Sequence, residues 1–379
     1  MSESTEPTKD LATLRDELAA KDTELVRLLA ERMGLIREVA KYKAANGLPS
    51  FDREREGALL DVLLAKAAEA GLPEDVVRDV FASLFAASRL DQRRFLQRSI
   101  ERFSIGIIGG TQGMGAFMAK VLRSAGYEVE TTGLEAGRSS EEVAASNDLV
   151  VLAVPIAATV EVARKVGASV RPGACLMDIT SLKRQPLVAM LESTPATVDV
   201  VGTHPMFGPH GLDFDRQKVV LCRGRGEAGF ARVKKLYETF GAETIEATAE
   251  EHDAQMALIQ VLIHEKTMVL GSVLERLKAD LGRSLQFASP IYRTELAMVG
   301  RIFSQRAELY ADILTRNDEA LRLSSIFEQE AGHFARAVAM SDRETIIQRF
   351  RQVSTYMQDF AAWAKKQSDA ILDELVRRG

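Results

Sequence analysis

The sequence has few of the features that mark secreted, membrane or metal-dependent proteins. Among 379 residues there are two cysteines, Cys175 and Cys222, and both lie in apolar runs, so neither disulfides nor a metal site organise the fold. No apolar run approaches the ~20 residues that span a bilayer. Residues 1–10 are polar and lack the segments of a signal peptide. We therefore expect a cytoplasmic protein with a disordered N-terminal tail, reduced thiols and no metal.

An excess of positive charge is also missing. The formal net charge is −5, so neither a nucleic acid nor an anionic membrane is expected as a partner. The apolar fraction of 46% and the charged fraction of 27% are those of an ordinary globular protein. A chain of this length is expected to form two or three domains.

Proline is absent, and glycine almost absent, from a long stretch in the first fifty residues. Residues 11–45 contain only Gly34, and their apolar residues recur every three or four positions, which predicts one long amphipathic helix. Shorter helical patterns follow at 53–70 and 73–98. We expect an all-α three-helix domain in residues 1–100. Because so long a helix cannot bury its apolar stripe against two shorter ones, we also expect an intertwined homodimer.

The end of the chain is similarly poor in helix breakers. Residues 249–378 contain one proline, Pro290, and four glycines, which predicts an all-α domain over 249–379. Two histidines in its first helix, His252 and His264, are twelve residues apart and do not share a face. Whether His252 is a structural histidine at an interface stays open.

The hydrophobic period changes at Phe103. Short apolar runs then alternate with helical stretches of 10–15 residues. This alternation predicts an α/β Rossmann-like, doubly wound parallel sheet in residues 101–248. The expected strands cover residues 104–108, 128–132, 149–154, 174–178, 198–201, 218–222 and 243–245.

A glycine-rich turn follows the first expected strand. Such a turn lets the backbone approach the pyrophosphate of a dinucleotide at a helix N-terminus. Gln112 stands where the usual pattern has its middle glycine. The expected cofactor-binding residues are Gly109, Gly110, Thr111, Gln112, Gly113, Met114 and Gly115.

The end of the second expected strand bears on the choice of cofactor. Gly133 stands where an acidic residue usually binds the adenosine ribose. Glu135 would favour the ribose diol of NAD, whereas Arg138 with Ser139 and Ser140 would favour the 2′-phosphate of NADP. We favour NAD and leave NADP open.

One histidine follows the strand at 198–201. His204 lies in G-T-H-P-M-F-G-P (202–209), whose glycines and prolines predict a rigid loop at the C-terminal end of the strand. Ligands of open α/β sheets bind at such ends, and a neutral imidazole can accept a hydroxyl proton. Ser181, in D-I-T-S-L-K, is expected at the neighbouring strand end, where its hydroxyl could orient His204. A structural histidine that caps a turn is the alternative.

The three-helix region also carries polar residues at helical spacing. Arg32 and Lys43 share a helix face, and Ser88 and Gln92 are i,i+4 neighbours. The pattern resembles the all-helical chorismate mutase family in L-R-D (14–16), A-E-R (30–32), Lys43, D-x-x-R-E (52–56) and S-x-x-x-Q (88–92).

The resemblance implies a role for each residue. Arg15 of the partner subunit, Arg32 and Arg55 would hold the two carboxylates of chorismate. Lys43 and Gln92 would face the ether oxygen. The remaining residues of the pocket would be Asp52, Glu56 and Ser88.

The rest of the chain resembles prephenate dehydrogenase. Four motifs occur in the order of that family: D-I-T-S-L-K, G-T-H-P-M-F-G-P, E-H-D-A-Q-M and S-P-I-Y-R-T-E-L-A-M-V-G-R. A mutase fused to it resembles the bifunctional enzymes of tyrosine biosynthesis, which make 4-hydroxyphenylpyruvate from chorismate through prephenate. The resemblance implies that His204 and Ser181 are catalytic, that Arg301 binds the ring carboxylate, and that His264 lies near a feedback site for tyrosine.

Two other functions stay open. The enzyme could oxidise arogenate instead of prephenate. The altered glycine turn also fits a mutase whose second domain has lost catalysis and senses tyrosine.

Overall fold

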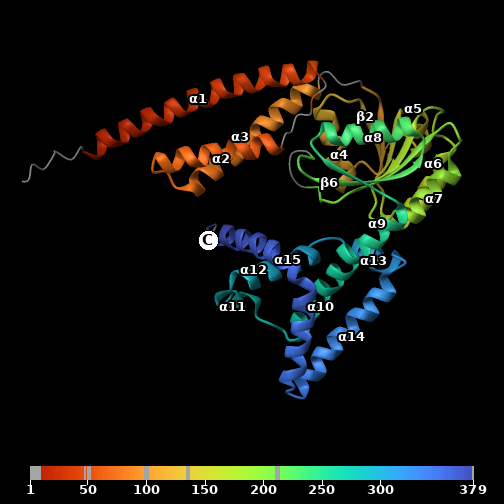
Figure 1. Ribbon diagram of the computed structural model, residues 1–379. Coiled ribbons are helices and arrows are strands. Elements are labelled where there is room, and N and C mark those ends of the chain that lie inside the picture. The colour runs from red at the N-terminus through yellow and green to blue at the C-terminus, as the bar shows by residue number, and fades with distance from the viewer. Residues whose placement is uncertain are drawn as a thin grey trace, which may run out of the picture. The chain divides into compact units, whose positions relative to one another are not determined.

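A computed structural model of the protein describes residues 10–46, 48, 53–97, 102–133, 137–209 and 214–377 (Figure 1). The contacts divide the chain into two compact units. The first unit comprises residues 1–150, 205–219 and 227–245; the second comprises residues 151–204, 220–226 and 246–379. The disordered tail predicted at 1–10 lies outside the described residues, apart from Asp10. The domain boundaries after residues 100 and 248 stay predictions.

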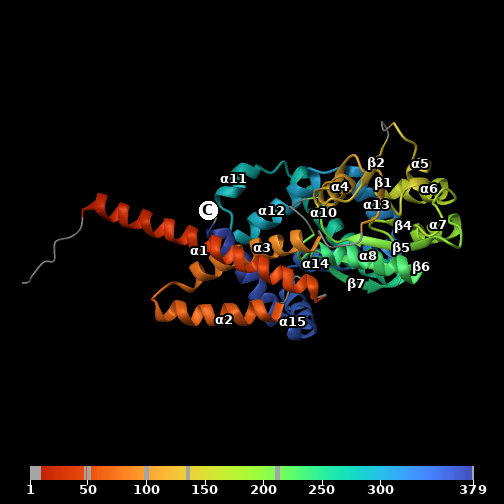
Figure 2. The same cartoon turned by 90° about the horizontal axis from the view of Figure 1, so that it is seen from above.

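Three helices begin the first unit: α1 (Leu11–Ala45), α2 (Arg53–Glu69) and α3 (Glu74–Gln97). The helices predicted for this region are therefore confirmed. Asp10 caps α1, because its carboxylate accepts a hydrogen bond of 2.7 Å from the Thr13 N–H. Both α1 and α2 pack against α3 (Figures 1 and 2).

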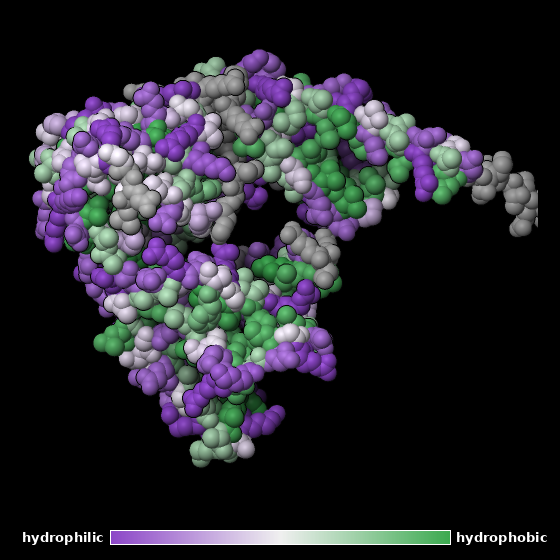
Figure 3. All heavy atoms as spheres, turned by 180° about the vertical axis from the view of Figure 1, so that it is seen from behind, coloured by the Kyte–Doolittle hydropathy of each residue, from purple (hydrophilic) through white to green (hydrophobic). Residues whose placement is uncertain are grey.

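The long helix buries almost nothing within one chain. Ala40 is the only buried residue of α1. Apolar side chains gather along one side of the three helices (Figure 3). The exposed leucines of α1 are Leu11, Leu14, Leu18, Leu25, Leu28, Leu29 and Leu35. An apolar stripe left open in this way is what the predicted dimer would cover.

Seven strands form one mixed sheet in the order β2-β1-β3-β4-β5-β6-β7. Their bounds are β1 Ile105–Ile108, β2 Val129–Thr132, β3 Leu149–Leu152, β4 Cys175–Asp178, β5 Asp199–Pro205, β6 Lys218–Arg225 and β7 Glu243–Ala247. The pairs β1/β2 and β4/β5 are parallel, as predicted. The two cysteines are buried free thiols.

The prediction of a wholly parallel sheet is wrong at β6. Met206 donates its N–H to the Lys218 carbonyl at 2.9 Å, while Gly224 lies against Val200 at the other end of the pair. The two strands therefore run antiparallel. Hydrophobic alternation shows where strands occur, but strand direction depends on how the connection returns, and here it returns Lys218 directly beside the end of β5.

The predicted loop around His204 is also corrected. The strand β5 continues through Gly202, Thr203 and His204 to Pro205. Glycine suits position 202 because a larger residue would have little room. A Cβ atom on Gly202 would lie 3.2 Å from the Lys183 side chain. Pro205 is tolerated because it is the last residue of the strand. His204 is thus held by sheet pairing as well as by turn residues.

Three helices flank strands of the first unit: α4 (Gly113–Ser124), α5 (Ser140–Ser146) and α8 (Glu227–Thr239). An aromatic cluster forms much of its core. Phe214, which is 2% exposed, has ring centroids 5.5–5.9 Å from those of Phe117, Phe207, Tyr237 and Phe240.

The second unit contains α6 (Ile156–Gly167) and α7 (Arg184–Ser193), followed by the C-terminal helices. A small core joins Ile156, Leu182, Val261, Ile313 and Ala320. The C-terminal helices are α9 Ala249–Met256, α10 Ile263–Arg276, α11 Leu281–Gln286, α12 Pro290–Phe303, α13 Ala307–Arg316, α14 Ala320–Ala339 and α15 Arg343–Arg377.

A π-helical segment, η1 (Ala257–Leu262), joins α9 to α10 without a break. By length and composition alone, the whole stretch Ala249–Arg276 could cross a membrane, and 17% of its most apolar window is buried. A core helix of a globular protein passes the same test, so this is weak evidence for a membrane.

Candidate active sites

The backbone on either side of His204 is fixed by the neighbouring strand. The pairing of β4 with β5 sets Asp178 opposite Gly202. Thr203 donates its hydroxyl to the Asp178 carbonyl at 2.6 Å. Lys183, fully buried, forms an ion pair with the Asp178 carboxylate and donates to the Thr203 carbonyl at 2.6 Å. The peptide that carries His204 therefore has little freedom to move.

The His204 ring is the first member of a hydrogen-bonded chain. His204 is 4% exposed, and its Nδ1 lies 2.9 Å from Nε2 of His252. Nδ1 of His252 lies 2.7 Å from Oδ1 of Asp253. The two rings meet edge to face, with an interplanar angle of 66°. We call His204, His252 and Asp253 the His204 site.

The electrostatics of this site favour uncharged rings. Burial, together with the positive charges that His252 and Lys183 would contribute, holds the pKa of His204 well below its ordinary value. Burial likewise lowers the pKa of His252. Burial opposes the ionisation of Asp253, but hydrogen bonds from His252 and from two backbone N–H groups hold the pKa of Asp253 below its usual range. At neutral pH the site thus combines two neutral imidazoles with one carboxylate, and a neutral imidazole can act as a base.

Ser181 lies in the turn that follows β4 and is half-buried. Among the residues that the structure describes, it makes no hydrogen bond to His204, whose Nδ1 partner is His252. The role predicted for Ser181 stays a prediction. From the sequence, His252 was considered only as a structural histidine at an interface, and Asp253 was not singled out, although both belong to the E-H-D-A-Q-M motif.

The glycine-rich turn has the geometry of a dinucleotide cradle. Gly109 and Gly113 adopt positive φ angles of 86° and 57°, and nothing lies within 4 Å of a Cβ atom placed on Gly113. The helix α4 begins at Gly113, and the side chain of its N-cap residue, Gln112, makes no capping hydrogen bond. The first N–H groups of α4 can therefore bind a pyrophosphate, and the residues present fit a bound dinucleotide.

The residues that could select a 2′-phosphate have internal partners. Arg138 pairs with Glu130 at 2.5 Å, and Ser139 caps α5 in a capping box with Glu142. Glu135 lies outside the described residues. The observed partners favour NAD over NADP.

The residues of the three-helix region converge in part. Arg32 donates to the Ser88 hydroxyl at 2.6 Å, which joins α1 to α3. Glu56 forms a 2.6 Å ion pair with Arg89, a buried residue beside Ser88. Gln92 is also buried, and its Oε1 has no hydrogen-bond partner among the described residues. An unpaired polar atom of this kind is suited to a polar ligand.

The other predicted residues of this site are less buried. Lys43 is half-buried in the last turn of α1, and Arg55 is exposed at the start of α2. Arg15 is exposed near the start of α1, and none of the hydrogen bonds or ion pairs described within the chain joins it to the other predicted residues. Asp52 lies outside the described residues.

Arg301 and His264 both lie close to Tyr310 in the second unit. The His264 and Tyr310 rings meet edge to face at 5.0 Å. Burial raises the pKa of Tyr310, an effect opposed by the positive charge of Arg301. Burial lowers the pKa of His264, whose Nδ1 is buried without a partner in the described part of the chain.

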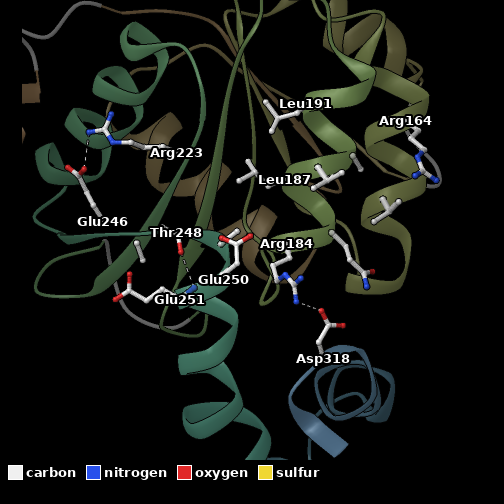
Figure 4. Close-up of a pocket in the computed structure, with 16 residues that line it drawn as sticks. Arg164, Arg184, Leu187, Leu191, Arg223, Glu246, Thr248, Glu250, Glu251 and Asp318 are labelled. Carbon is white, nitrogen blue, oxygen red and sulfur yellow. Dashed lines mark hydrogen bonds and ion pairs between the residues drawn. The ribbon is translucent and has the colours of Figure 1, made fainter.

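A separate pocket of about 870 Å³ lies in the second unit, between α6, α7 and the start of α9 (Figure 4). Two of the arginines that line it point toward acidic partners: Arg184 pairs with Asp318 at 2.5 Å and Arg223 with Glu246 at 2.9 Å. None of the predicted catalytic residues lines it. We do not assign the chemistry to this pocket.

Comparison with known families divides the chain into three regions. Residues 14–93 match the family described as chorismate mutase type II. Residues 118–246 match the nucleotide-binding domain of prephenate dehydrogenase, and residues 248–352 match its dimerization domain.

Two curated relatives extend over nearly the whole chain. The T-protein of Haemophilus influenzae is 34% identical over 366 residues, which cover 96% of this chain and 97% of the relative. The T-protein of Enterobacter agglomerans is 34% identical over 355 residues, covering 93% and 94%.

One solved structure supports the fold alone. The prephenate dehydrogenase from A. aeolicus, in complex with hydroxyphenyl propionate and NAD+, aligns with a TM-score of 0.54. It is 19% identical, and the alignment covers 69% of this chain and 99% of that one.

Proposed function

This chain belongs to the T-protein family, the bifunctional chorismate mutase and NAD-dependent prephenate dehydrogenase of tyrosine biosynthesis, and we propose which residues perform each reaction. The observation that carries the proposal is the burial of His204 beside its hydrogen-bond partner His252, because burial lowers the pKa of His204 and favours the neutral ring. The proposed domains are residues 1–100 for the mutase, 101–248 for nucleotide binding and 249–379 for dimerisation and substrate binding.

In the dehydrogenase reaction, His204 accepts the proton of the ring hydroxyl of prephenate. Residues 109–115 would hold NAD, which would supply the acceptor for the hydride that leaves the ring carbon bearing this hydroxyl. Loss of CO2 then returns its bonding electrons to the ring, which becomes aromatic. Arg301 binds the ring carboxylate as a charge-assisted pair, and Ser181 orients His204. The proton, the hydride and the carboxylate are thereby all accounted for.

The mutase reaction needs no nucleophile. Chorismate is a dianion, so Arg32 and Arg55, with Arg15 of a second subunit, hold its carboxylates. Lys43 and Gln92 face the ether oxygen, on which negative charge develops as the bond breaks. Asp52, Glu56 and Ser88 complete the pocket. The hydrogen bond between Arg32 and Ser88 supports this grouping, because it joins two predicted pocket residues from different helices.

The assembly and its regulation complete the proposal. The match to a dimerization domain and the exposed leucines of α1 support a homodimer. Tyrosine is proposed as a feedback inhibitor that binds near His264. Prephenate is preferred to arogenate as the substrate, and comparing turnover on the two compounds tests this choice.

Replacing the base tests the dehydrogenase assignment. In the variant His204→Asn we expect prephenate oxidation to fall by about 10²–10⁴-fold, with little change in KM, because a general base is lost but the binding groups remain. Chorismate consumption serves as the internal control and should be unchanged. An unaltered rate of prephenate oxidation would remove His204 from the catalytic role.

A further inference from the structure

The carboxylate of Asp253 is fixed by hydrogen bonds from the backbone as well as from His252. It accepts hydrogen bonds from the N–H groups of Lys183, at 2.8 Å, and Arg184, at 3.0 Å, where α7 begins. Asn317 donates to the Asp253 carbonyl at 2.8 Å. A helix N-terminus stabilises a negative charge, and the two donors fix the plane of the carboxylate. Asp253 is therefore a rigid anionic acceptor.

From this acceptor the proton positions follow in order. An ionised carboxylate can only accept, so the His252 nitrogen that lies 2.7 Å from Oδ1, Nδ1, must carry hydrogen. A neutral His252 ring then has a bare Nε2, which must accept a hydrogen bond. Its partner at 2.9 Å is Nδ1 of His204, so that nitrogen must carry hydrogen as well. In a neutral His204 ring the proton-free atom is then Nε2.

We propose that His252 and Asp253 form a positioning dyad for prephenate oxidation, which fixes His204 in the tautomer whose Nε2 can accept the substrate proton. The inference rests on the proposed function of His204 as the base. The dyad touches neither substrate nor cofactor in this account; it acts through His204. It also explains why a second histidine is buried here, with 1% of its surface exposed, beside an acidic residue.

Matched substitutions of His252 separate positioning from packing. A Gln side chain can place an amide oxygen near the former Nε2 and still accept from His204, whereas Leu fills similar space and accepts nothing. We expect His252→Leu to lower kcat for prephenate by about 100-fold or more, and His252→Gln to stay within about tenfold of the wild type. KM for prephenate should change little in either. Equal kcat values for the two variants would overturn the dyad.

NMR spectroscopy identifies the tautomer of His204 without an activity assay. In ¹⁵N-labelled wild-type protein, two-bond ¹⁵N–¹H correlations distinguish the ring nitrogen that carries hydrogen from the bare one. For His204, assigned by its loss in His204→Asn, we expect hydrogen on Nδ1. Hydrogen on Nε2 would overturn the proposal, and this result does not depend on whether any His252 variant folds.

The outcomes also separate this inference from the function on which it rests. An inactive His204→Asn together with equally active His252→Leu and His252→Gln would overturn the dyad alone. An active His204→Asn would overturn the assignment of His204 as the base, and the dyad with it. Chorismate mutase activity of each variant, together with its thermal unfolding midpoint, controls for the loss of the fold.

Discussion

The two catalytic regions of this chain are built in opposite ways. The His204 site is closed, because His204 and His252 are only 4% and 1% exposed. The hydrogen-bonded chain that they begin ends on the Asp253 carboxylate, which two backbone N–H groups hold in place. The three-helix region is open: its longest helix buries one residue, and Gln92 Oε1 lacks a partner in the described chain. The hydrogen-bonded chain of the His204 site thus lies within one chain, whereas the three-helix region leaves polar and apolar groups uncovered.

The difference follows the chemistry. A base that removes a hydroxyl proton must be neutral and correctly protonated before the substrate arrives, and burial with fixed partners achieves this. A pocket for a dianion instead needs cations whose donors pair with the substrate itself. Lys43 and Arg55 are accordingly only half-buried or exposed. We infer that the pocket of the three-helix region is completed when chorismate binds and a second subunit packs against it.

Among substitutions in the three-helix region, the largest expected effect comes from Lys43. Lys43→Ala should lower chorismate mutase activity by about 10²–10³-fold or more, because a donor to the ether oxygen is lost. Prephenate oxidation by the same protein should be unchanged, since the His204 site shares no residue with α1. Chorismate loss and NAD reduction measured on one preparation check both statements. Mutase turnover at the wild-type rate would refute the assignment of Lys43.

A moderate effect is expected from the open face of α1. Leu18 is 62% exposed in the single chain, and Leu18→Glu would place a charge in the proposed subunit interface. We expect mutase activity to fall by about tenfold at low protein concentration, with a smaller loss when the protein is concentrated. Sedimentation and mutase assays across a dilution series measure this.

The matched control lies on the same helix. Ala20 is also exposed but points about 200° away from Leu18 around the helix axis. Ala20→Glu should leave both activities and the assembly unchanged. If the two variants behave alike, the face of α1 that contains Leu18 is not an interface.

The smallest expected effect concerns pH. Because the pKa of His204 is held well below 6.5, the base should stay deprotonated, and prephenate turnover nearly constant, as the pH falls from neutral to 6.5. Turnover should decline only at lower pH. The lowered pKa values of His204 and His252 also mean that the unfolded chain binds protons first, so the free energy of unfolding decreases below pH 6.5. A pH profile of kcat that falls with a midpoint at 6.5 or above would contradict the buried, neutral base.

Local patterns predicted much of the fold. The bounds of α1 were predicted at Leu11 and Ala45 from the regular spacing of its apolar residues, whereas its cap, Asp10, was recognised only in the structure. The direction of β6 was not predictable, because alternation of apolar and polar residues is the same in either direction. The continuation of β5 through Pro205 was also missed. The sequence does not show that the chain returns at Lys218 to accept a hydrogen bond from the Met206 N–H.

The sequence predicted a site residue only where that residue lies in a short, recognisable motif. His204 is in a short, distinctive segment, whereas its partner His252 is 48 residues away and meets it only through the packing of α9 in the second unit. Asp253 depends further on the start of α7, 70 residues earlier in the chain. Long-range contacts of this kind have no periodic signal. By contrast, the hydrogen bond between Arg32 and Ser88 joins two residues that the resemblance to chorismate mutases had already grouped.

The most direct test of two separate sites in one chain is a mixing experiment that follows NAD reduction with chorismate as the only substrate. Lys43→Ala should produce very little prephenate, and His204→Asn should accumulate it, so each variant alone should reduce almost no NAD. An equimolar mixture should restore NAD reduction, because prephenate released by one variant is oxidised by the other. Rapid NAD reduction by either variant alone, or a mixture that stays as inactive as its components, would contradict the account.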